Sequence, residues 1–427
     1  MTSQTHPFRA GRRSVGFPII LALTLALFAN SGRAADTGLD AYGGTRSIKG
    51  QATGWFHLEQ VQGRWFFITP DGHAYIPIGV NHLGTYFTGA DRNLRPTEHD
   101  FVKERHGGDV KQAAAHVEKM IRDWGFNYAG YDSPVHFRQS LPFSTGFRQT
   151  QTSGVRSGTP PQYTDVFAPD FAADLDQRVA DFVRPFRENR YLLGYYLVDL
   201  PLWGDHAYLA AEEKSQGESW LSFFRKLPAG SPGQLAYAKA TRDAPDLMAA
   251  ELAFTAEIAE HSYRLTAEAF RRHDPNHLVL GERFAGVRLF MPVVEKSAKY
   301  FPAVATQLDG EFNAATYREL HRRTGRPIIS VDHVANFPTP TTLTVMGRPL
   351  QNEEAAAAHY ARYLRAAFAE PYLIGYNHCQ LVSRIRREGE PPSWKQGIID
   401  PAGEPYPRLL QAITTTNHEV LEQLYRK

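Results

Sequence analysis

Short apolar β-type segments alternate with helical segments along most of this chain, and this alternation constrains the fold more than any other feature. Residues 191–198, 277–284 and 326–332 are β-type segments of strand length, each with an apolar run, and helical periodicity returns after each of them. Strands separated by helices form a parallel sheet, because a helix is the usual crossover between parallel strands. About eight such units predict an α/β fold, the closed (β/α)8 TIM barrel, whose functional residues follow the carboxyl ends of its strands. A doubly wound open sheet is the alternative.

Two further segments flank this pattern. Turn signals at 62–63 and 71–72 predict a small N-terminal β-hairpin that leads into a buried strand at 74–80. Residues 205–246, after the fourth strand, are rich in Gly, Pro and Lys and lack a continuous helical period, so we expect an insertion there. The sequence contains no dinucleotide fingerprint, P-loop or paired-cysteine motif. We therefore expect residues 35–427 to form a single (β/α)8 domain of the catalytic type that needs no cofactor.

Residues 1–34 have the pattern of a cleaved signal peptide. Three arginines precede an apolar run at 15–29, and Gly32 and Ala34 stand at the small-residue positions of a cleavage site. The apolar run is short for a membrane span, so we expect no stable membrane insertion after cleavage, and an uncleaved anchor is the alternative. The pattern predicts a bacterial periplasmic or secreted protein.

The charge of the chain gives no reason to expect a nucleic-acid partner. Four of the 47 basic residues and none of the 45 acidic residues lie in the predicted signal peptide, so the remaining chain carries a formal charge of −2. Such a balance lacks the basic excess that nucleic-acid binding needs. Cys379 is the only cysteine, which excludes an intramolecular disulfide.

Polar residues follow directly after several of the apolar β segments. In a parallel barrel all strand ends meet at one face, so these side chains are expected to surround one cleft. In chain order they are Asn81 and His82; Asn127, Tyr131 and Asp132; Asp199, Trp203, Asp205 and His206; Glu282 and Arg283; Gln307, Asp309 and Glu311; Asp332 and His333; Asn377, His378 and Gln380.

Eight short motifs in a fixed order carry a resemblance to a known family. They are "GRWFFITPDGHAYIPIGVNHLG", "GFNYAGYDSP", "DVFAPDF", "NRYLLGYYLVDLPLW", "DPNHLVLGERF", "RPIISVD", "YLIGYNHCQ" and "GIIDPAGEPYPRLL". From about residue 54 to the C-terminus, the sequence resembles the exo-acting β-agarases and their relatives among the clan A glycoside hydrolases. The resemblance implies a TIM barrel that hydrolyses a β-linked carbohydrate, galactan-like or acidic.

The sequence departs from that family at the positions of the catalytic residues. In the family, the fourth strand ends in Asp-Asn-Glu-Leu-Pro-Trp, whose Glu is the general acid/base, and the seventh strand is closed by a nucleophilic Glu. Here Asp199 takes the acid/base position if Leu202 is an insertion, and Leu200 takes it otherwise. Asp332 stands at the nucleophile position, and His378 replaces a tryptophan that usually forms the floor of the sugar site.

Glycoside hydrolysis needs a carboxylic acid at the leaving oxygen and a carboxylate opposite it. We expect Asp199 to be the acid and Asp332 the base, with Glu282 as a reserve acid. Retaining enzymes hold their carboxyl groups about 5–5.5 Å apart, and inverting enzymes about 6.5–9.5 Å. Because Asp is one carbon shorter than Glu, each exchange withdraws a carboxyl group by roughly 1.5 Å. We therefore expect the inverting mechanism.

The remaining residues at the strand ends are expected to bind the carbohydrate. They are Asn81, His82, Asn127, Tyr131, Trp203, Arg283, Glu311, His333, His378 and Arg384. If the segment after the eighth strand turns inward, Arg384, Arg386 and Arg387 would suit a uronate or a sulfated sugar, because guanidinium groups bind such anions in a bidentate manner.

Three alternatives stay open at this point. In the first, Asp199 is a structural residue that forms hydrogen bonds at a strand end. In the second, Glu282 forms an ion pair with arginines of neighbouring loops. In the third, Arg384, Arg386 and Arg387 belong to a solvated loop. A non-catalytic carbohydrate-binding relative that has lost the catalytic Glu pair is the alternative for the whole protein.

A metal-dependent hydrolase on the same barrel is a further alternative. His82, His333 and His378 would then converge on a metal ion together with Asp332. The sequence shows no local ligand spacing such as His-x-His, so our assignment contains no metal.

Overall fold

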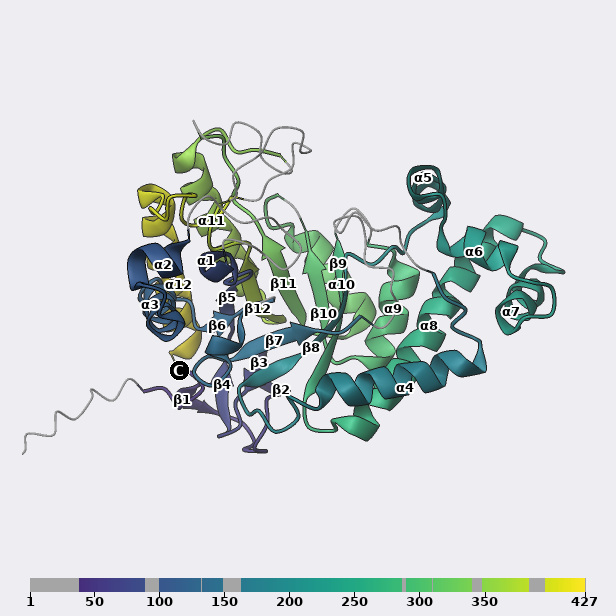
Figure 1. Cartoon of the computed structure of the whole chain (residues 1–427), viewed down its shortest axis with the longest axis horizontal. Helices are drawn as coiled ribbons and strands as arrows, with labels where there is room; N and C mark the ends of the chain where they lie inside the picture. The colour runs from purple at the N-terminus through teal and green to yellow at the C-terminus, as the bar shows by residue number, and fades with distance from the viewer. Residues whose placement is uncertain are drawn as a thin grey trace, which may run out of the picture. The chain divides into compact units, whose positions relative to one another are not determined.

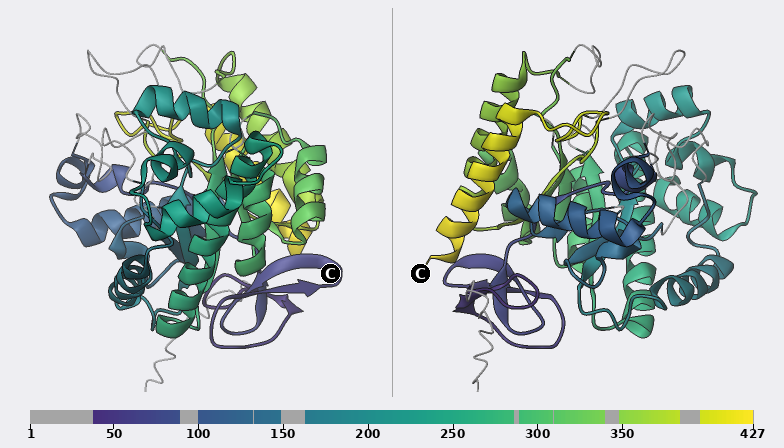
Figure 2. Two further views of the ribbon diagram at one scale, coloured as in Figure 1. Left: turned by 90° about the vertical axis from the view of Figure 1, so that its right-hand side faces the viewer. Right: turned by 60° about the vertical axis from the view of Figure 1, so that its left-hand side comes forward.

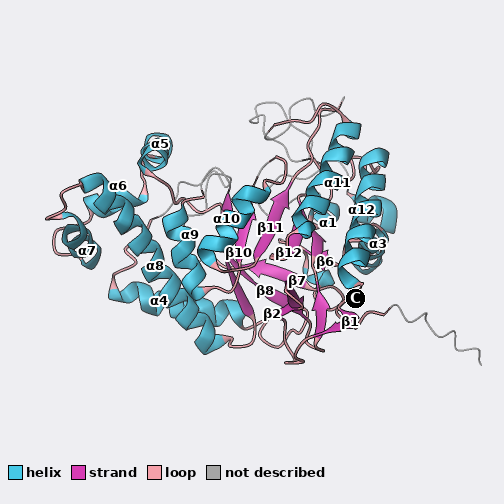
Figure 3. Ribbon diagram, turned by 180° about the vertical axis from the view of Figure 1, so that it is seen from behind, coloured by secondary structure: helices cyan, strands magenta, loops and turns pink. Residues whose placement is uncertain are grey.

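Eight parallel strands close into a barrel, which confirms the predicted (β/α)8 fold (Figure 3). The strands follow one another around the barrel in chain order, and the last, β12, pairs with the first, β5. Their bounds are β5 (Ile78–Val80), β6 (Tyr128–Ala129), β7 (Phe143–Gly146), β8 (Leu192–Asp199), β9 (Leu278–Ala285), β10 (Val304–Gln307), β11 (Ile328–His333) and β12 (Leu373–His378).

The structure is a computed structural model that describes most of the chain. The described residues are 38–88, 100–131, 133–148, 163–285, 289–308, 310–339, 348–383 and 396–426. They belong to one compact unit, Gly38–Lys427. The expected signal peptide lies outside the described residues, so it stays a prediction.

Helices cover the outside of the barrel (Figure 1). They are α1 (Thr85–Thr88), α2 (Phe101–His106), α3 (Val110–Asp123), the 3-10 turn η1 (Val135–Phe137), α4 (Pro169–Val183), α8 (Leu247–His273), α9 (Met291–Tyr300), α10 (Ala314–Thr324), α11 (Glu353–Ala369) and α12 (Pro407–Tyr425). α3 illustrates their formation: the Asp109 side chain caps its first turn, and Val117 and Ile121 bury one face. α11 and α12 lie side by side (Figure 2), joined by a 2.7 Å hydrogen bond from Tyr360 to Asn417. In the described part of the chain, no helix has the length and apolar character needed to cross a membrane.

The N-terminal hairpin is part of a larger antiparallel sheet than the sequence predicts. Its order is β1 (Thr45–Lys49), β4 (His73–Tyr75), β3 (Arg64–Ile68) and β2 (His57–Val61). The β2–β3 turn consists of Gln62 and Gly63, whose φ angles of 52° and 81° suit a tight hairpin. The Trp65 amide donates to the Pro371 carbonyl at 2.9 Å, just before β12 begins. This bond places the sheet at the amino ends of the barrel strands, away from the predicted site.

The insertion after β8 is helical, which the sequence did not predict. It contains α5 (His206–Gln216), α6 (Trp220–Lys226) and α7 (Pro232–Thr241). Each of these short helices begins at a side-chain cap, Asp205, Ser219 or Ser231, and this local signal substitutes for a long helical period. Trp220 anchors the insertion to the barrel by stacking on Trp203, with ring centroids 4.9 Å apart and an interplanar angle of 5°.

We predict that Trp220→Ala destabilises the protein by about 3–5 kcal/mol, because it removes a fully buried ring and leaves a cavity. Chemical denaturation followed by circular dichroism measures the change. Leu235→Ala is the control, because Leu235 on α7 is 55% exposed and its truncation should cost less than about 0.5 kcal/mol. Equal losses in both variants would show that the stacked pair does not anchor the insertion.

Candidate active site

Arg283 occupies the centre of the carboxyl end of the barrel. It lies near the end of β9 and is 1% exposed. Its Nη1 lies 3.1 Å from Oδ1 of Asp199, and its Nη2 lies 3.4 Å from Oδ1 of Asp332. Burial opposes the charge of Arg283, but the two neighbouring aspartates raise its pKa above the ordinary value. One buried guanidinium group therefore joins the two aspartates that the sequence predicts to be catalytic.

Asp199 is the last residue of β8 and pairs with Arg283 of β9 in the strand register. Its Oδ1 also accepts a 2.5 Å hydrogen bond from Nε2 of Gln307, which ends β10. The side chain of Asp199 is 30% exposed, whereas that of Asp332 is 5% exposed. Asp199 is thus the member of the pair that solvent reaches more easily.

Asp332 lies near the end of β11 and has a φ of 63°, a left-handed conformation that is uncommon for a non-glycine residue. Its Oδ1 accepts a 2.9 Å hydrogen bond from Nδ2 of Asn81. Oδ1 of Asn81 in turn accepts the Tyr131 amide proton, also at 2.9 Å. Asn81 therefore orients the Asp332 carboxylate and ties it to the loop after β6.

Tyr131 packs against the buried arginine. The guanidinium carbon lies 4.3 Å from the centroid of the Tyr131 ring, and the His82 ring approaches the same ring edge-on at 6.3 Å. Gly146 allows this packing, because a Cβ at that position would lie 2.5 Å from the Tyr131 ring. The structure thus brings together Asn81, His82, Tyr131, Asp199, Arg283 and Asp332, as the sequence analysis expects.

Glu282 points the opposite way from Arg283, because successive residues of a strand face opposite sides of the sheet. Its Oε2 accepts hydrogen bonds from Nε1 of Trp203 at 2.8 Å and from the Tyr263 hydroxyl of α8 at 2.5 Å. Burial raises the pKa of Glu282 to about 8, although both hydrogen bonds oppose this shift. The structure therefore does not support the expected role of Glu282 as reserve acid.

Trp203 lies beside Glu282, on the side of the sheet opposite to Arg283. It is 2% exposed, and one ring face is covered by Trp220. Such burial leaves it no surface on which a sugar could stack, so the expected role in substrate binding is corrected to one in packing.

His333, His378 and Glu311 lie against α11 rather than beside Arg283. His333 contacts the Tyr376 hydroxyl at 2.7 Å and Nε2 of His359 at 3.0 Å, and burial lowers its pKa well below the ordinary value. His378 is 1% exposed and packs edge-on against Tyr360. Glu311 lies on the surface, beside His359 and Arg362. These contacts give structural roles to three expected substrate ligands, and His333 and His378 do not join His82 around a metal ion.

Asn127 lies at the wrong end of the barrel for substrate binding. Strand β6 contains only Tyr128–Ala129, so Asn127 precedes it instead of following it. Its side chain accepts from the Ile78 amide at 2.9 Å and donates to the Ile76 carbonyl at 3.0 Å. It therefore closes the amino end of the barrel, and the sequence-based placement is wrong.

Several expected residues lie outside the described part of the chain. They are Asp132, Asp309, Arg384, Arg386 and Arg387. The expected role of Arg384 in binding an anionic sugar stays a prediction.

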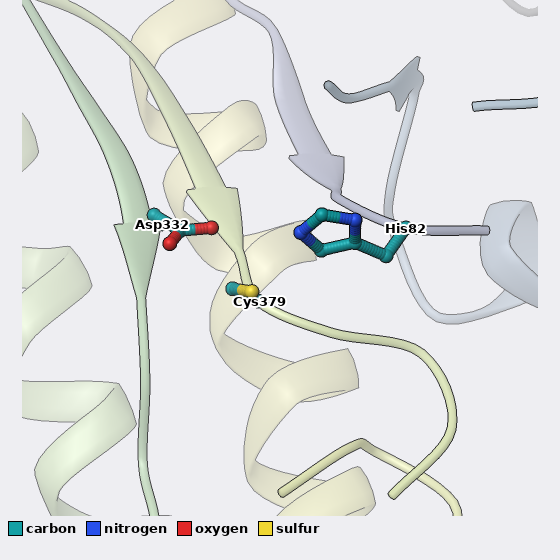
Figure 4. A group of neighbouring side chains, drawn as sticks. All are labelled: His82, Asp332 and Cys379. Carbon is teal, nitrogen blue, oxygen red and sulfur yellow. The ribbon is translucent and has the colours of Figure 1, made fainter. Parts of the chain in front are cut away.

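The sequence analysis missed one member of the site, Cys379. It directly follows β12 and is fully buried. One ligand atom each of Cys379, His82 and Asp332 lies within 4.8 Å of the others (Figure 4). The position of Cys379 directly after an apolar strand was the available signal, but we considered this residue only as a disulfide partner.

Comparison with known proteins supports the fold. No protein-family model matches the sequence, and no curated protein matches it. Among solved structures, an exo-β-agarase superposes with a TM-score of 0.73 over 91% of this chain and 68% of its own, at 16% identity. In fold, the chain resembles this exo-β-agarase.

Two further structures agree with this exo-β-agarase-like fold. The agarase AgWH50C has a TM-score of 0.71 at 18% identity, covering 91% of this chain and 67% of its own. PfGH50B has a TM-score of 0.74 at 16% identity, covering 91% and 69%. Identity this low establishes the shared fold, and the activity has to be argued from the site itself.

We predict that Glu282→Gln changes how stability depends on pH. In the unfolded chain Glu282 loses its proton near pH 4.5, whereas burial retains the proton in the folded chain up to about pH 8. The wild-type protein therefore loses stability as pH rises through this interval, by up to about 1.4 kcal/mol per pH unit. Glutamine stays neutral, so the melting temperature of the variant should gain on that of the wild type between pH 4.5 and pH 8.

The control for this prediction is Glu257→Gln, because Glu257 is exposed on the same helix as Tyr263. The difference in melting temperature between this variant and the wild type should stay constant between pH 4.5 and pH 8. A flat difference for Glu282→Gln as well would show that Glu282 does not hold its proton in the fold.

Proposed function

We propose that the protein is a glycoside hydrolase that cleaves a β-linked, galactan-like or acidic poly- or oligosaccharide. The observation that carries this proposal is the pair Asp199 and Asp332, which meet on one guanidinium group at the carboxyl end of an exo-β-agarase-like barrel. Two carboxyl groups across a cleft are the chemical requirement for hydrolysis of a glycosidic bond.

The roles of the two aspartates follow from their exposure and charge. Arg283 compensates only one of the two negative charges, so the group carries a net charge of −1 when both carboxyl groups are ionised. Asp199 is the more exposed of the two, so the leaving oxygen of a bound carbohydrate reaches it more easily, and it acts as the general acid. Asp332, held by Asn81, acts as the general base that activates a water molecule.

Arg283 supplies a further means of binding a carbohydrate. Among the described residues, its Nε finds no hydrogen-bond acceptor, and its Nη2 has only the 3.4 Å ion pair with Asp332. Buried donors without acceptors are costly, so a ligand oxygen that reaches them would be bound favourably. Sugar hydroxyl groups and the carboxylate or sulfate of an acidic sugar all provide such oxygens.

We also propose that the protein acts outside the cytoplasm, in the periplasm or as a secreted enzyme. The apolar segment at 15–29 and the small residues Gly32 and Ala34 support this localisation. A polymeric carbohydrate would meet the enzyme there.

The first test is hydrolysis of a panel of purified marine, plant and bacterial glycans, followed by release of reducing ends. We expect turnover on at least one β-linked galactan or acidic glycan. Asp199→Asn and Asp332→Asn should each lower kcat at least 100-fold, because general acid and base catalysis contribute about 10²–10⁴-fold.

Asp205→Asn is the matched control, because Asp205 lies six residues after Asp199 and Asn preserves its capping of α5. It should retain wild-type kcat. Full activity in Asp199→Asn would remove Asp199 from catalysis.

We predict inversion of anomeric configuration. The two Oδ1 atoms that contact Arg283 are separated by no more than roughly 9 Å, the sum of both ion-pair distances and the span of the guanidinium fork. This limit admits the spacings of both inverting and retaining enzymes, and inversion is expected because each Asp is one carbon shorter than the Glu it replaces. NMR of the first product should therefore show the α-anomer, and a β-anomer with a covalent adduct on Asp332 would establish retention instead.

A non-catalytic carbohydrate-binding protein is the second candidate. It is favoured by the sequence itself, because Asp199 and Asp332 stand where the β-agarases have their two catalytic Glu residues. Tight binding of a glycan without turnover on any substrate in the panel would support this candidate over the hydrolase.

A further inference from the structure

His82, Asp332 and Cys379 stand at the carboxyl ends of three neighbouring strands. The barrel order β11–β12–β5 places Asp332, Cys379 and His82 side by side (Figure 4). Backbone hydrogen bonds fix this arrangement: the Cys379 amide donates to the His333 carbonyl, and the Asn81 amide donates to the His378 carbonyl, both at 2.9 Å. The cluster is therefore a product of barrel register, not of a mobile surface.

The distances within the cluster suit a bound cation. The three ligand atoms lie within 4.8 Å of one another. In a tetrahedral zinc site, bonds of about 2.0–2.3 Å place the ligand atoms roughly 3.3–3.8 Å apart. A contraction of about 1 Å would close the site around the ion. His82 is only half-buried, so its ring has room to take part in this contraction, whereas Asp332 and Cys379 are buried.

The donor set identifies the class of cation. A thiolate, an imidazole and a carboxylate form a set that binds Zn²⁺ and related borderline-soft divalent ions, whereas Mg²⁺ and Ca²⁺ prefer oxygen ligands alone. A catalytic Cys–His–Asp relay would use the two ring nitrogens of the histidine separately. Here a single His82 nitrogen lies near both the sulfur and the carboxylate oxygen, which is the geometry of a shared ion.

Charge supports the same conclusion. Asp199, Arg283 and Asp332 together carry a charge of −1, because two carboxylates surround one guanidinium group. Zn²⁺ with the Cys379 thiolate adds a charge of +1, which neutralises the group. The positive charge of Arg283, 3.4 Å from Asp332, is thus balanced rather than repelled within the complete site.

We propose that His82, Asp332 and Cys379 bind one Zn²⁺ or a similar divalent cation. Binding does not depend on the proposed glycosidase activity. If the protein is a glycosidase, the ion occupies the carboxylate of the general base, so Zn²⁺ inhibits hydrolysis.

Cobalt binding tests the proposal directly, because Co²⁺ replaces Zn²⁺ and gives an ultraviolet charge-transfer absorption when a thiolate coordinates it. The purified full chain is treated with a chelator, freed from it and titrated with Co²⁺. We expect one equivalent to bind with a thiolate charge-transfer band, and Zn²⁺ to displace it.

Variants identify the ligands. Cys379→Ser should abolish the band, and His82→Gln should weaken Co²⁺ affinity at least 10-fold. Asp205→Asn is the matched control, because it removes an exposed carboxylate that lies outside the cluster and outside the ion pairs of Arg283; it should bind Co²⁺ within about 2-fold of the wild type. Because Cys379 is fully buried, circular dichroism must confirm that its variant folds, and His82→Gln provides an independent test at a half-buried position.

Absence of a charge-transfer band in the wild-type protein would overturn the proposal. So would unchanged Co²⁺ affinity in His82→Gln, or equal weakening in Asp205→Asn. None of these results involves a glycan, so they leave the proposed hydrolysis to its own test.

Discussion

The ion pairs of Arg283 hold the functional end of the barrel together. The guanidinium group is buried, and its charge is compensated by Asp199 on the neighbouring strand β8 and by Asp332 on β11. A buried charge without a partner costs several kcal/mol, so the arginine requires the aspartates as much as they require it. The proposed acid and base therefore owe both their position and their charge balance to one residue.

The alternation of side chains along each strand decides which residues reach the site. Arg283 faces Asp199 and Asp332, whereas its neighbour Glu282 faces the helices and bonds to Trp203 and Tyr263. The same alternation separates the residues around Arg283 from the layer under α11, where His333 and His378 lie.

The sequence predicted the barrel because the alternation of strands and helices is a long-range pattern that local irregularities do not obscure. It placed Asn81, Asp199 and Asp332 at one end correctly, since each directly follows or ends a clear apolar strand. It misplaced Asn127 because β6 is only two residues long. The side of the sheet to which each strand-end side chain points was harder to predict. The β8–β9 and β11–β12 pairings contain register shifts, and these break the simple alternation of side chains at the strand ends. The place of Cys379 in the site could not be predicted, because its neighbours His82 and Asp332 are distant in sequence.

The most direct measurement of the central claim compares the thermal stability of Arg283→Met with that of the double variant Arg283→Met/Asp332→Asn. Removing the arginine leaves buried negative charge and should cost about 3–5 kcal/mol. Neutralising Asp332 then relieves that charge, so the account predicts that the double variant melts at a higher temperature than Arg283→Met alone. A double variant that melts lower, by as much as Asp332→Asn lowers the wild type, would show that the two residues act independently and would contradict the account.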